Sequence, residues 1–419
     1  MEISTINPKE TKRNLWKYFS PVKYQLHATI STIGSAIESV DDKIVYMEDL
    51  EKRKKAYGIC GECNEPGTGE DWCQSCNAKR FKDRFKNWTS ENKDIDEFIQ
   101  QSQLNAEYYK KYLEWIPFEN FKDITYIIKG GFGKIYSAKW PEGYIYYWDI
   151  ENQEWKKYVD KKVALKSLDN SSCISTEFLN EIKTHLQIYL LDVIQCYGIT
   201  QDPNTKDYMM VLEYCENGNL RNYYLNNESD YYSKIDELIR IVSGLLDLHN
   251  AGKVHKDFHP GNILYDVHTD PYISDLGMCQ SANNEKHSVK QEGIYGVLPY
   301  MAPEVLRGYQ YTKASDIYSF GIIKNEYISE ETPYNNIPHN HALAIKICKG
   351  LRPNIFKYTP KLLADLITKY PQAIYTSRLL NFKNLPEPVN SAVATKTTLY
   401  SECFDCQLDE SDFNEVNQD

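Results

Sequence analysis

The chain has 419 residues and a mass of 48.9 kDa, which is enough for about two or three domains with sizeable cores. Its net charge of -11 and sequence pI near 5.4 argue against broad electrostatic binding to nucleic acid or anionic membranes. No run approaches the roughly 20 apolar residues that span a bilayer, and the first ten residues lack a secretion signal, so we expect a cytoplasmic or, as an open alternative, a nuclear protein.

Four cysteines in two pairs are the first informative pattern along the chain. Two residues separate Cys60 from Cys63, and two separate Cys73 from Cys76. This spacing lets both thiolates of a pair face one ion, and two pairs complete a tetrahedral Zn2+ site. The flanking residues are too polar to hold a core of this size without metal. We therefore expect a small structural zinc ribbon; four unrelated free cysteines are the alternative.

The residues around this ribbon allow two interpretations. Lysines and arginines lie before it at 52–55 and after it at 79–86, and Phe81, Phe85 and Trp88 have the spacing of one helical face. A basic stripe beside aromatic side chains can bind RNA or phosphate groups. We favour an amphipathic helix that buries the three aromatic side chains and leaves the lysines in water, so we do not expect nucleic acid as a partner.

Two further segments precede the catalytic motifs. Residues 90–117 are polar and then aromatic, which predicts a helical linker. Between Trp140 and Val163 the chain holds two aromatic-rich runs around residues 149–152, and this pattern predicts a β-hairpin that extends the flanking strands. Such a hairpin could dock a partner, but we expect its aromatic side chains to pack on one another.

Residues 255–262 (HKDFHPGN), followed thirteen residues later by Asp275-Leu276-Gly277, carry the clearest chemistry. Asp257 could orient and deprotonate an attacking hydroxyl, while Asn262 and Asp275 present oxygens to Mg2+ that bridges nucleotide phosphates. Hard oxygen ligands of this kind suit Mg2+. The ordered pair of motifs predicts a phosphoryl-transfer site.

Other motifs stand in a fixed order around these residues. They are Ile128-Lys129-Gly130-Gly131-Phe132-Gly133-Lys134-Ile135, Val163-Ala164-Leu165-Lys166, Phe178-Leu179-Asn180-Glu181, Met210-Val211-Leu212-Glu213-Tyr214-Cys215, Ala302-Pro303-Glu304 and Ser315-Asp316-Ile317-Tyr318-Ser319-Phe320-Gly321. The whole set resembles a eukaryotic protein kinase. Its wording is closest to the tyrosine-kinase-like group, and the layout resembles kinases expanded in some symbiotic soil fungi, in which a cysteine pair motif precedes the kinase.

The resemblance implies an α+β, bilobal fold with a small β-rich N-lobe and a helical C-lobe. Lys166, held by Glu181, would grip the α- and β-phosphates of ATP, Asp275 and Asn262 would hold Mg2+, and Asp257 would orient the hydroxyl of a protein substrate. The nucleotide would also contact Ile128, Gly130, Gly131, Phe132, Gly133, Ile135, Ala164, Leu212 as gatekeeper, Glu213, Cys215 and Leu264. Serine or threonine, or dual specificity, is favoured over tyrosine alone.

Several positions depart from the family pattern. His259 stands where serine/threonine kinases usually have a lysine, and Val297 stands where they have a threonine that contacts that lysine. We hypothesise that His259 takes over contact near the γ-phosphate, which would make the rate sensitive to pH near neutrality. Ile128 replaces the first glycine of the loop, and Lys256 replaces an arginine.

The C-lobe is expected to be short, because the stretch that normally supplies an arginine partner for Glu304 is missing. Arg352 or Arg378 could substitute, or Glu304 could lie in water. This shortening keeps a second function open, a pseudokinase or scaffold that binds nucleotide without transferring phosphate. The expected division is an undecided segment at 1–50, a zinc-ribbon-like module at 51–89, a linker at 90–117, the kinase domain at 118–369 and a polar acidic tail at 370–419.

Overall fold

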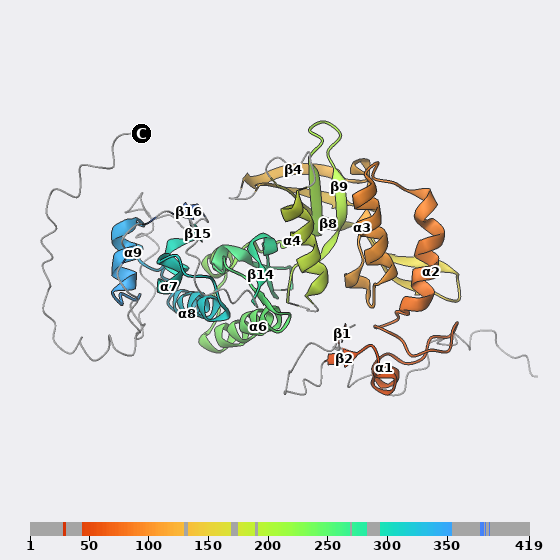
Figure 1. Ribbon diagram of the computed structural model, residues 1–419, viewed down its shortest axis with the longest axis horizontal. Coiled ribbons are helices and arrows are strands. Elements are labelled where there is room, and N and C mark those ends of the chain that lie inside the picture. Colours follow the sequence, from red (N-terminus) through yellow and green to blue (C-terminus); the bar gives the residue numbers. More distant parts are fainter. Residues whose placement is uncertain are drawn as a thin grey trace, which may run out of the picture.

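The computed structural model describes residues 28–30, 44–129, 133–168, 175–188, 192–268, 270–282, 294–353, 378–380, 382 and 385. These residues form two lobes, one built on a β-sheet and one composed mainly of helices (Figure 1). Among the described helices, none combines the length and the hydropathy that a membrane span requires. The expected bilobal α+β fold is confirmed, and the cysteine module lies on the side of the sheet-bearing N-lobe.

A six-stranded sheet with the order β3-β9-β10-β8-β5-β4 forms the N-lobe. Val163, Leu165, Met209 and Val211 are buried on its two central strands, β8 and β10. All neighbouring strands are antiparallel except β3 and β9, which are parallel. The strands are β3 (Glu114–Trp115), β4 (Lys122–Lys129), β5 (Gly133–Trp140), β8 (Lys161–Leu168), β9 (Cys196–Gln201) and β10 (Tyr208–Glu213).

Helix α4 (Thr176–Gln187) begins where the Ser175 side chain accepts a hydrogen bond from the backbone N–H of Phe178. It belongs to one buried cluster with α3 (Lys93–Leu104), in which Ile95 and Ile99 join Phe178. The helix expected within 90–117 is present as α3, and it packs into the N-lobe. Its apolar residues recur at helical spacing, and burying them makes α3 and β3 part of the N-lobe.

The predicted hairpin is present, but its packing differs from the expectation. Among the described residues, strands β6 (Tyr144–Asp149) and β7 (Glu154–Tyr158) pair only with each other and form a sheet separate from the six-stranded one. Trp148 and Trp155 do contact each other, with ring centroids 5.1 Å apart. Trp155 also stacks at 5.0 Å on Phe81 of α2 (Gln74–Arg84), so the hairpin packs against the cysteine module.

The remaining elements of the N-terminal part are short. They are β1 (Ala28–Ile30), β2 (Ile44–Tyr46) and α1 (Leu50–Tyr57).

Phe81 is buried on α2 and Phe85 packs against the same aromatic cluster, whereas Lys79 and Lys82 are exposed. The favoured interpretation as an amphipathic helix is confirmed for Phe81, whereas Trp88 lies beyond the end of α2 and packs, half-buried, against the cluster of α3 and α4.

The C-lobe is organised around α6 and α8, whose contact buries its main apolar cluster. Its helices are α5 (Leu220–Asn226), α6 (Tyr231–Asn250), α7 (Pro303–Leu306), α8 (Lys313–Ser329) and α9 (His341–Cys348). Its short strands are β11 (Lys253–Val254), β12 (Ile263–Tyr265), β13 (Pro271–Ile273), β14 (Gln280–Ser281), β15 (Ile294–Gly296) and β16 (Arg378–Leu380).

Strand β16 lies beyond the expected end of the kinase domain at residue 369. It pairs antiparallel with β15, and Leu380 is buried in the C-lobe, where Phe382 and Leu385 pack against the same cluster. These apolar residues attach part of the expected 370–419 tail to the C-lobe. The expected loss of the last helix falls on residues 354–377, which lie outside the described residues.

Candidate active site

Lys166 lies at the centre of the site, on the middle strand β8. The sheet register places it opposite Ile135 on β5 and Met210 on β10. Its Nζ atom donates to Glu181 Oε1 at 2.7 Å and to Asp275 Oδ1 at 2.7 Å. Burial disfavours the ammonium, but the two carboxylates outweigh burial and raise the pKa of Lys166 above its ordinary value. The lysine is thus charged and held between the two lobes.

The position of Glu181 depends on close packing against the Asp275-Leu276-Gly277 turn. Glu181 is buried on α4, and a Cβ atom added to Gly277 would lie 2.9 Å from its Oε2 atom. Asp275 adopts a left-handed backbone conformation with φ of 59°, which non-glycine residues reach only when surrounding structure holds them there. Gly277 leaves room for the Glu181 carboxylate, and the strained backbone of Asp275 accompanies the contact of its carboxylate with Lys166.

Asp257 and Asn262 come from the loop between β11 and β12, and both are buried. The Asn262 side-chain Nδ2 donates to the backbone carbonyl of Asp257 at 2.9 Å. Because Nδ2 is used in this bond, the amide oxygen is the Asn262 atom that can accept a cation. Together with the Asp275 carboxylate it offers the hard oxygen ligands that Mg2+ prefers, so the residues present fit this ion.

Asp316, at the start of α8, accepts hydrogen bonds from the backbone of this loop. Its Oδ2 atom accepts from the backbone N–H of His255 at 2.8 Å and lies 2.9 Å from Nε2 of His249, while Oδ1 accepts from the N–H of Lys256 at 3.0 Å. Thr312 and Ser315 form a capping box that starts α8 at this point. The expectation that residues 315–321 underpin the catalytic loop is confirmed in geometry.

His259 faces Asp257 across the loop. Its Nδ1 atom accepts the backbone N–H of Gly261 at 3.0 Å, and its Nε2 atom lies 3.6 Å from Asp257 Oδ2. A Cβ atom on Gly261 would lie only 2.6 Å from the imidazole, so the glycine makes room for the ring. Val297, the other departure from the family pattern, is buried in the same C-lobe cluster as Phe258. The arrangement places an imidazole where the family pattern has a lysine.

Several of the expected nucleotide-contacting residues lie on the neighbouring strands β5, β8 and β10. Ala164 lies opposite Ser137 and Leu212, and Ile135 lies opposite Lys166; the side chains of Ala164, Leu212 and Ile135 are half-buried. Glu213 and the buried Cys215 continue from β10 toward the C-lobe, where Leu264 lies on β12. The other expected contacts are Ile128, which is exposed at the end of β4, Gly133, which begins β5, and Gly130, Gly131 and Phe132, which lie outside the described residues.

Sequence reasoning missed an ion pair of the C-lobe whose carboxylate is fully buried. Glu326 of α8 accepts hydrogen bonds from Arg221 Nε at 2.9 Å and from the Tyr224 hydroxyl at 3.0 Å, and it also pairs with the Tyr300 hydroxyl. Arg352, considered as a partner for Glu304, instead donates to the backbone carbonyls of residues 347 and 351. No local motif marks the Glu326 network, because its members lie far apart in the sequence.

Comparison with known proteins decides the family. The model of the protein tyrosine and serine/threonine kinase family matches residues 122–387, more than half of the chain. The chain belongs to the protein kinase family. The match also continues past residue 369, in agreement with the attachment of β16 to the C-lobe.

Individual relatives of this kinase are similar at modest identity. A receptor-like serine/threonine-protein kinase of Arabidopsis thaliana is 27% identical over 218 residues, covering 50% of this chain and 24% of the relative. A probable serine/threonine-protein kinase of Dictyostelium discoideum is 27% identical over 252 residues, covering 56% and 17%, and another from that organism is 30% identical over 232 residues, covering 53% and 13%. The chain thus matches a quarter or less of the length of these relatives.

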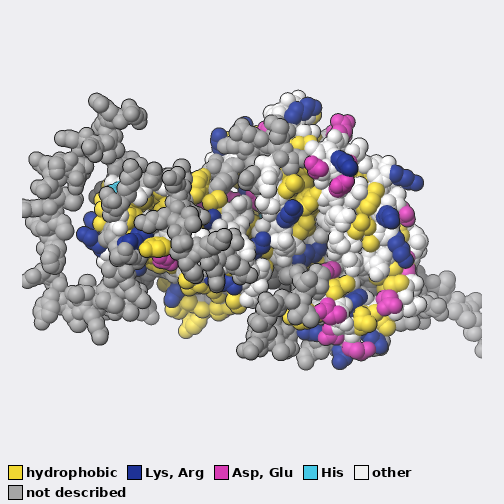
Figure 2. All heavy atoms as spheres, viewed as in Figure 1, with side chains coloured by type: hydrophobic (Ala, Val, Ile, Leu, Met, Phe, Trp, Pro, Cys, Tyr) yellow, Lys and Arg dark blue, Asp and Glu magenta, His cyan; other side chains and the backbone are white. Residues whose placement is uncertain are grey.

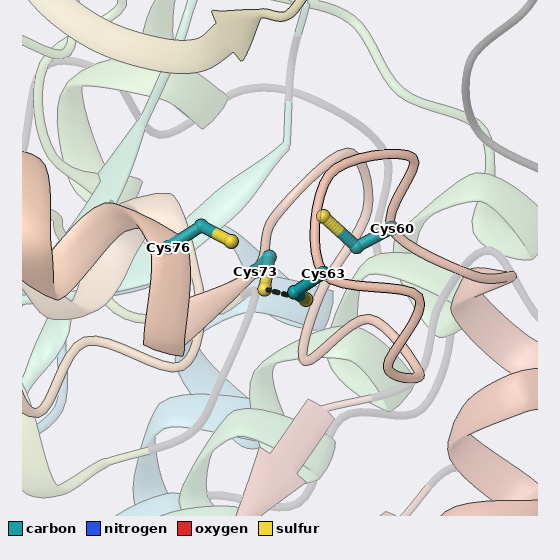
Figure 3. A group of neighbouring side chains, drawn as sticks. All are labelled: Cys60, Cys63, Cys73 and Cys76. Carbon is teal, nitrogen blue, oxygen red and sulfur yellow. Dashed lines mark hydrogen bonds between the residues drawn. The ribbon is translucent and has the colours of Figure 1, made fainter.

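The four cysteines of the kinase's N-terminal module converge as predicted. Their Sγ atoms all lie within 4.8 Å of one another, and those of Cys63 and Cys73 are 3.6 Å apart (Figure 3). Zn–S bonds of about 2.3 Å would put tetrahedral sulfur ligands about 3.8 Å apart, so the cluster fits a zinc ion with little adjustment. Cys60 and Cys63 come from the loop after α1, and Cys73 and Cys76 from the start of α2.

Two arginines of the basic runs around the cysteines, Arg53 and Arg80, have structural roles. Arg53 of α1 is buried and donates to the backbone carbonyls of Met47, Pro66 and Gly67 at 2.8, 2.6 and 3.0 Å. Its guanidinium therefore joins α1 to the cysteine-bearing loop. Arg80 of α2 pairs with Glu62 in that loop and lies 4.3 Å above the ring of Trp148. These two arginines serve the packing of the module.

Proposed function

We propose that this chain is an active protein kinase of the tyrosine-kinase-like group, which transfers the γ-phosphate of ATP to a serine or threonine hydroxyl of a protein. The observation that carries the proposal is the pair of hydrogen bonds from Lys166 to Glu181 and Asp275, which joins the two lobes at the site. The relatives' names, all of serine/threonine-protein kinases, support the serine/threonine preference.

The residues have distinct roles in this reaction. Asp257 accepts the proton of the substrate hydroxyl, whose oxygen forms a bond to the γ-phosphorus while the bond from that phosphorus to the β–γ bridging oxygen breaks. Lys166 stabilises the negative charge on the α- and β-phosphates, and ADP leaves. Asn262 and Asp275 would hold Mg2+, which neutralises charge on the phosphate oxygens. Positioning and charge neutralisation therefore account for most of the catalysis.

Autophosphorylation of the full-length chain with Mg2+ and ATP tests this proposal. We expect phosphate to appear on serine or threonine, detected by mass spectrometry, and to be lost in Asp257→Asn, which keeps the shape of the side chain but cannot accept the proton. Phosphate incorporation that persists unchanged in Asp257→Asn would contradict the assigned role of this residue.

The alternative is a pseudokinase or scaffold that binds nucleotide and partners without phosphoryl transfer. It predicts saturable binding of magnesium-ATP to well-folded protein, with no phosphate transferred to the chain or to generic acceptor proteins. Binding measured by calorimetry alongside the transfer assay separates the two functions. The paired state of Lys166 favours the active enzyme over this alternative.

The cysteine module is proposed to hold one structural zinc ion. Native mass spectrometry should give one zinc per chain, and Cys63→Ala should lose the metal and lower the midpoint of thermal unfolding, because metal binding contributes folding free energy. Cys279→Ala is the matched control, since Cys279 lies far along the chain in the C-lobe and outside the cluster. Full zinc content in Cys63→Ala would contradict the site.

Nucleic acid is not proposed as a partner of this module. On the face shown in Figure 2, acidic and basic side chains are interspersed over the surface that holds α1. Mixed charges of this kind give no continuous basic track for a phosphate backbone. The net charge of -11 agrees with this view.

His259 is proposed to contact the substrate near the γ-phosphate, at the position where the family pattern has a lysine. Its Nε2 atom lies 3.6 Å from the Asp257 carboxylate, close to the reacting groups. We expect His259→Ala to lower kcat and His259→Lys to restore it. Initial rates of the three proteins check the prediction, and an unchanged kcat in His259→Ala counts against it.

A further inference from the structure

Lys111 joins the segment before the kinase sheet to the helix that carries Glu181. Its Nζ atom donates to the backbone carbonyls of Leu186 at 2.7 Å and Ile188 at 3.3 Å, at the C-terminal end of α4. The last carbonyls of a helix have no partner within the helix, and a lysine there also meets the negative end of the helix dipole. Lys111 therefore fixes this end of α4 from outside the helix.

The contact with α4 distinguishes Lys111 from the lysine that precedes it. Desolvation lowers the pKa of Lys111 to about 7, and either protonation state of the amine can donate N–H bonds to the two carbonyls. Lys110, the preceding residue of the same turn, has no hydrogen bond to α4 among the described residues and lies near the ring of Tyr109. Of these two adjacent lysines, Lys111 donates hydrogen bonds to α4 and Lys110 does not, among the described residues.

The cysteine module holds the segment that carries Lys111. The indole Nε1 of Trp72, the residue before Cys73, donates to the carbonyl of Ala106 at 2.7 Å, and the Trp72 ring stacks on Tyr112 with centroids 5.8 Å apart. Gln74 Nε2 donates to the carbonyl of Leu104 at 3.3 Å. These contacts flank Lys111 on both sides along the chain.

The other end of the segment is fixed by the sheet. Strand β3 follows Lys111 and pairs in parallel with β9, where a Cβ atom on Gly198 would lie 2.0 Å from the carbonyl oxygen of Glu114. The glycine at this position permits the close approach of the two backbones. The segment from α3 to β3 is thus anchored at both of its ends.

We propose that Lys111 is a positioning residue for phosphoryl transfer, and that the cysteine module, through Trp72, keeps Lys111 against α4 so that Glu181 reaches Lys166. This inference rests on the proposed kinase function for its consequence in the reaction. The physical connection itself runs from the cysteine-bearing loop through residues 104–112 to the end of α4. It makes the module an internal support of the active site.

Lys111→Met in the full-length, zinc-loaded chain tests the inference. We expect amide hydrogens in the last turn of α4 to exchange about tenfold faster, the size of effect that a lost buried hydrogen bond produces. We also expect kcat to fall about tenfold with a smaller change in KM for ATP, because Lys166 stays in place while its partner moves. Lys111→Arg should restore both values, and Lys110→Met should leave both near wild type.

Three results would overturn the inference: unchanged exchange of α4 in Lys111→Met, failure of Lys111→Arg to restore it, or faster exchange spread evenly over α4 and α8. If Lys111→Met does not fold, Trp72→Phe replaces it, since this change removes one N–H donor and keeps an aromatic ring; its residues 104–112 and α4 should exchange faster than α8. A chain that transfers no phosphate would refute the proposed function, while the exchange pattern would still decide the role of Lys111.

Discussion

Lys166→Met is expected to reduce kcat/KM by about a hundredfold to a thousandfold, the effect of removing one preorganised group that stabilises charge in a transition state. It should also destabilise the fold. Methionine preserves the length of the side chain but leaves Glu181 buried without its cation, and a buried charge that loses its partner costs about 3–5 kcal/mol. Urea unfolding and initial rates measured on the same protein check both effects.

The double variant Lys166→Met with Glu181→Gln separates stability from catalysis. The neutral amide removes the uncompensated charge, so the free energy of unfolding should recover most of the loss, while phosphoryl transfer should stay as low as in Lys166→Met. The fold would then depend on charge balance at this position and the reaction on the ammonium itself. Recovery of activity in the double variant would refute the assigned role of Lys166.

Arg221→Met is expected to lower the free energy of unfolding by about 3–5 kcal/mol, because it strands the Glu326 carboxylate in the C-lobe core. The side chain of Glu326 is 0% exposed and that of Arg221 is 21% exposed, so water cannot replace the lost guanidinium. The Tyr300 hydroxyl, which bonds both residues, belongs to the segment before Ala302-Pro303-Glu304. Urea denaturation measures the change.

Arg240→Met provides the matched control for this effect. Arg240 also pairs with a carboxylate, that of Asp270, but the two side chains are 54% and 46% exposed. An exposed pair contributes about 0–1 kcal/mol, so unfolding of Arg240→Met should stay close to that of the wild type. Equal losses in the two variants would show that burial does not govern the Glu326 network.

The sequence was most informative where chemistry requires particular residue types at fixed spacing. Lys166, Asp257, Asn262 and Asp275 could be predicted because phosphate and Mg2+ restrict which side chains can serve, and the cysteine pairs could be predicted because tetrahedral metal ligation restricts spacing. In each case a short motif carries the information. The structure then brings these residues together from different elements.

Contacts between distant segments were not predictable in the same way. Arg221 and Glu326 are 105 positions apart, and Lys111 and Leu186 are 75 apart. The sequence around a lysine or an arginine in a polar run does not show which carbonyl or carboxylate its side chain will contact. The apolar residues of α3 indicate a buried face at helical spacing, but they do not show which surface buries it.

Strand β16 has a practical consequence for the study of this kinase. Recognisable motifs end well before residue 378, so an expression boundary chosen from them alone would remove the strand that pairs with β15. Such a shortened chain would expose the backbone edge of β15 and the apolar side chains that Leu380 covers, and exposed strand edges promote aggregation. Poor solubility of that fragment would then reflect where it was cut, and a boundary beyond residue 387 would avoid the problem.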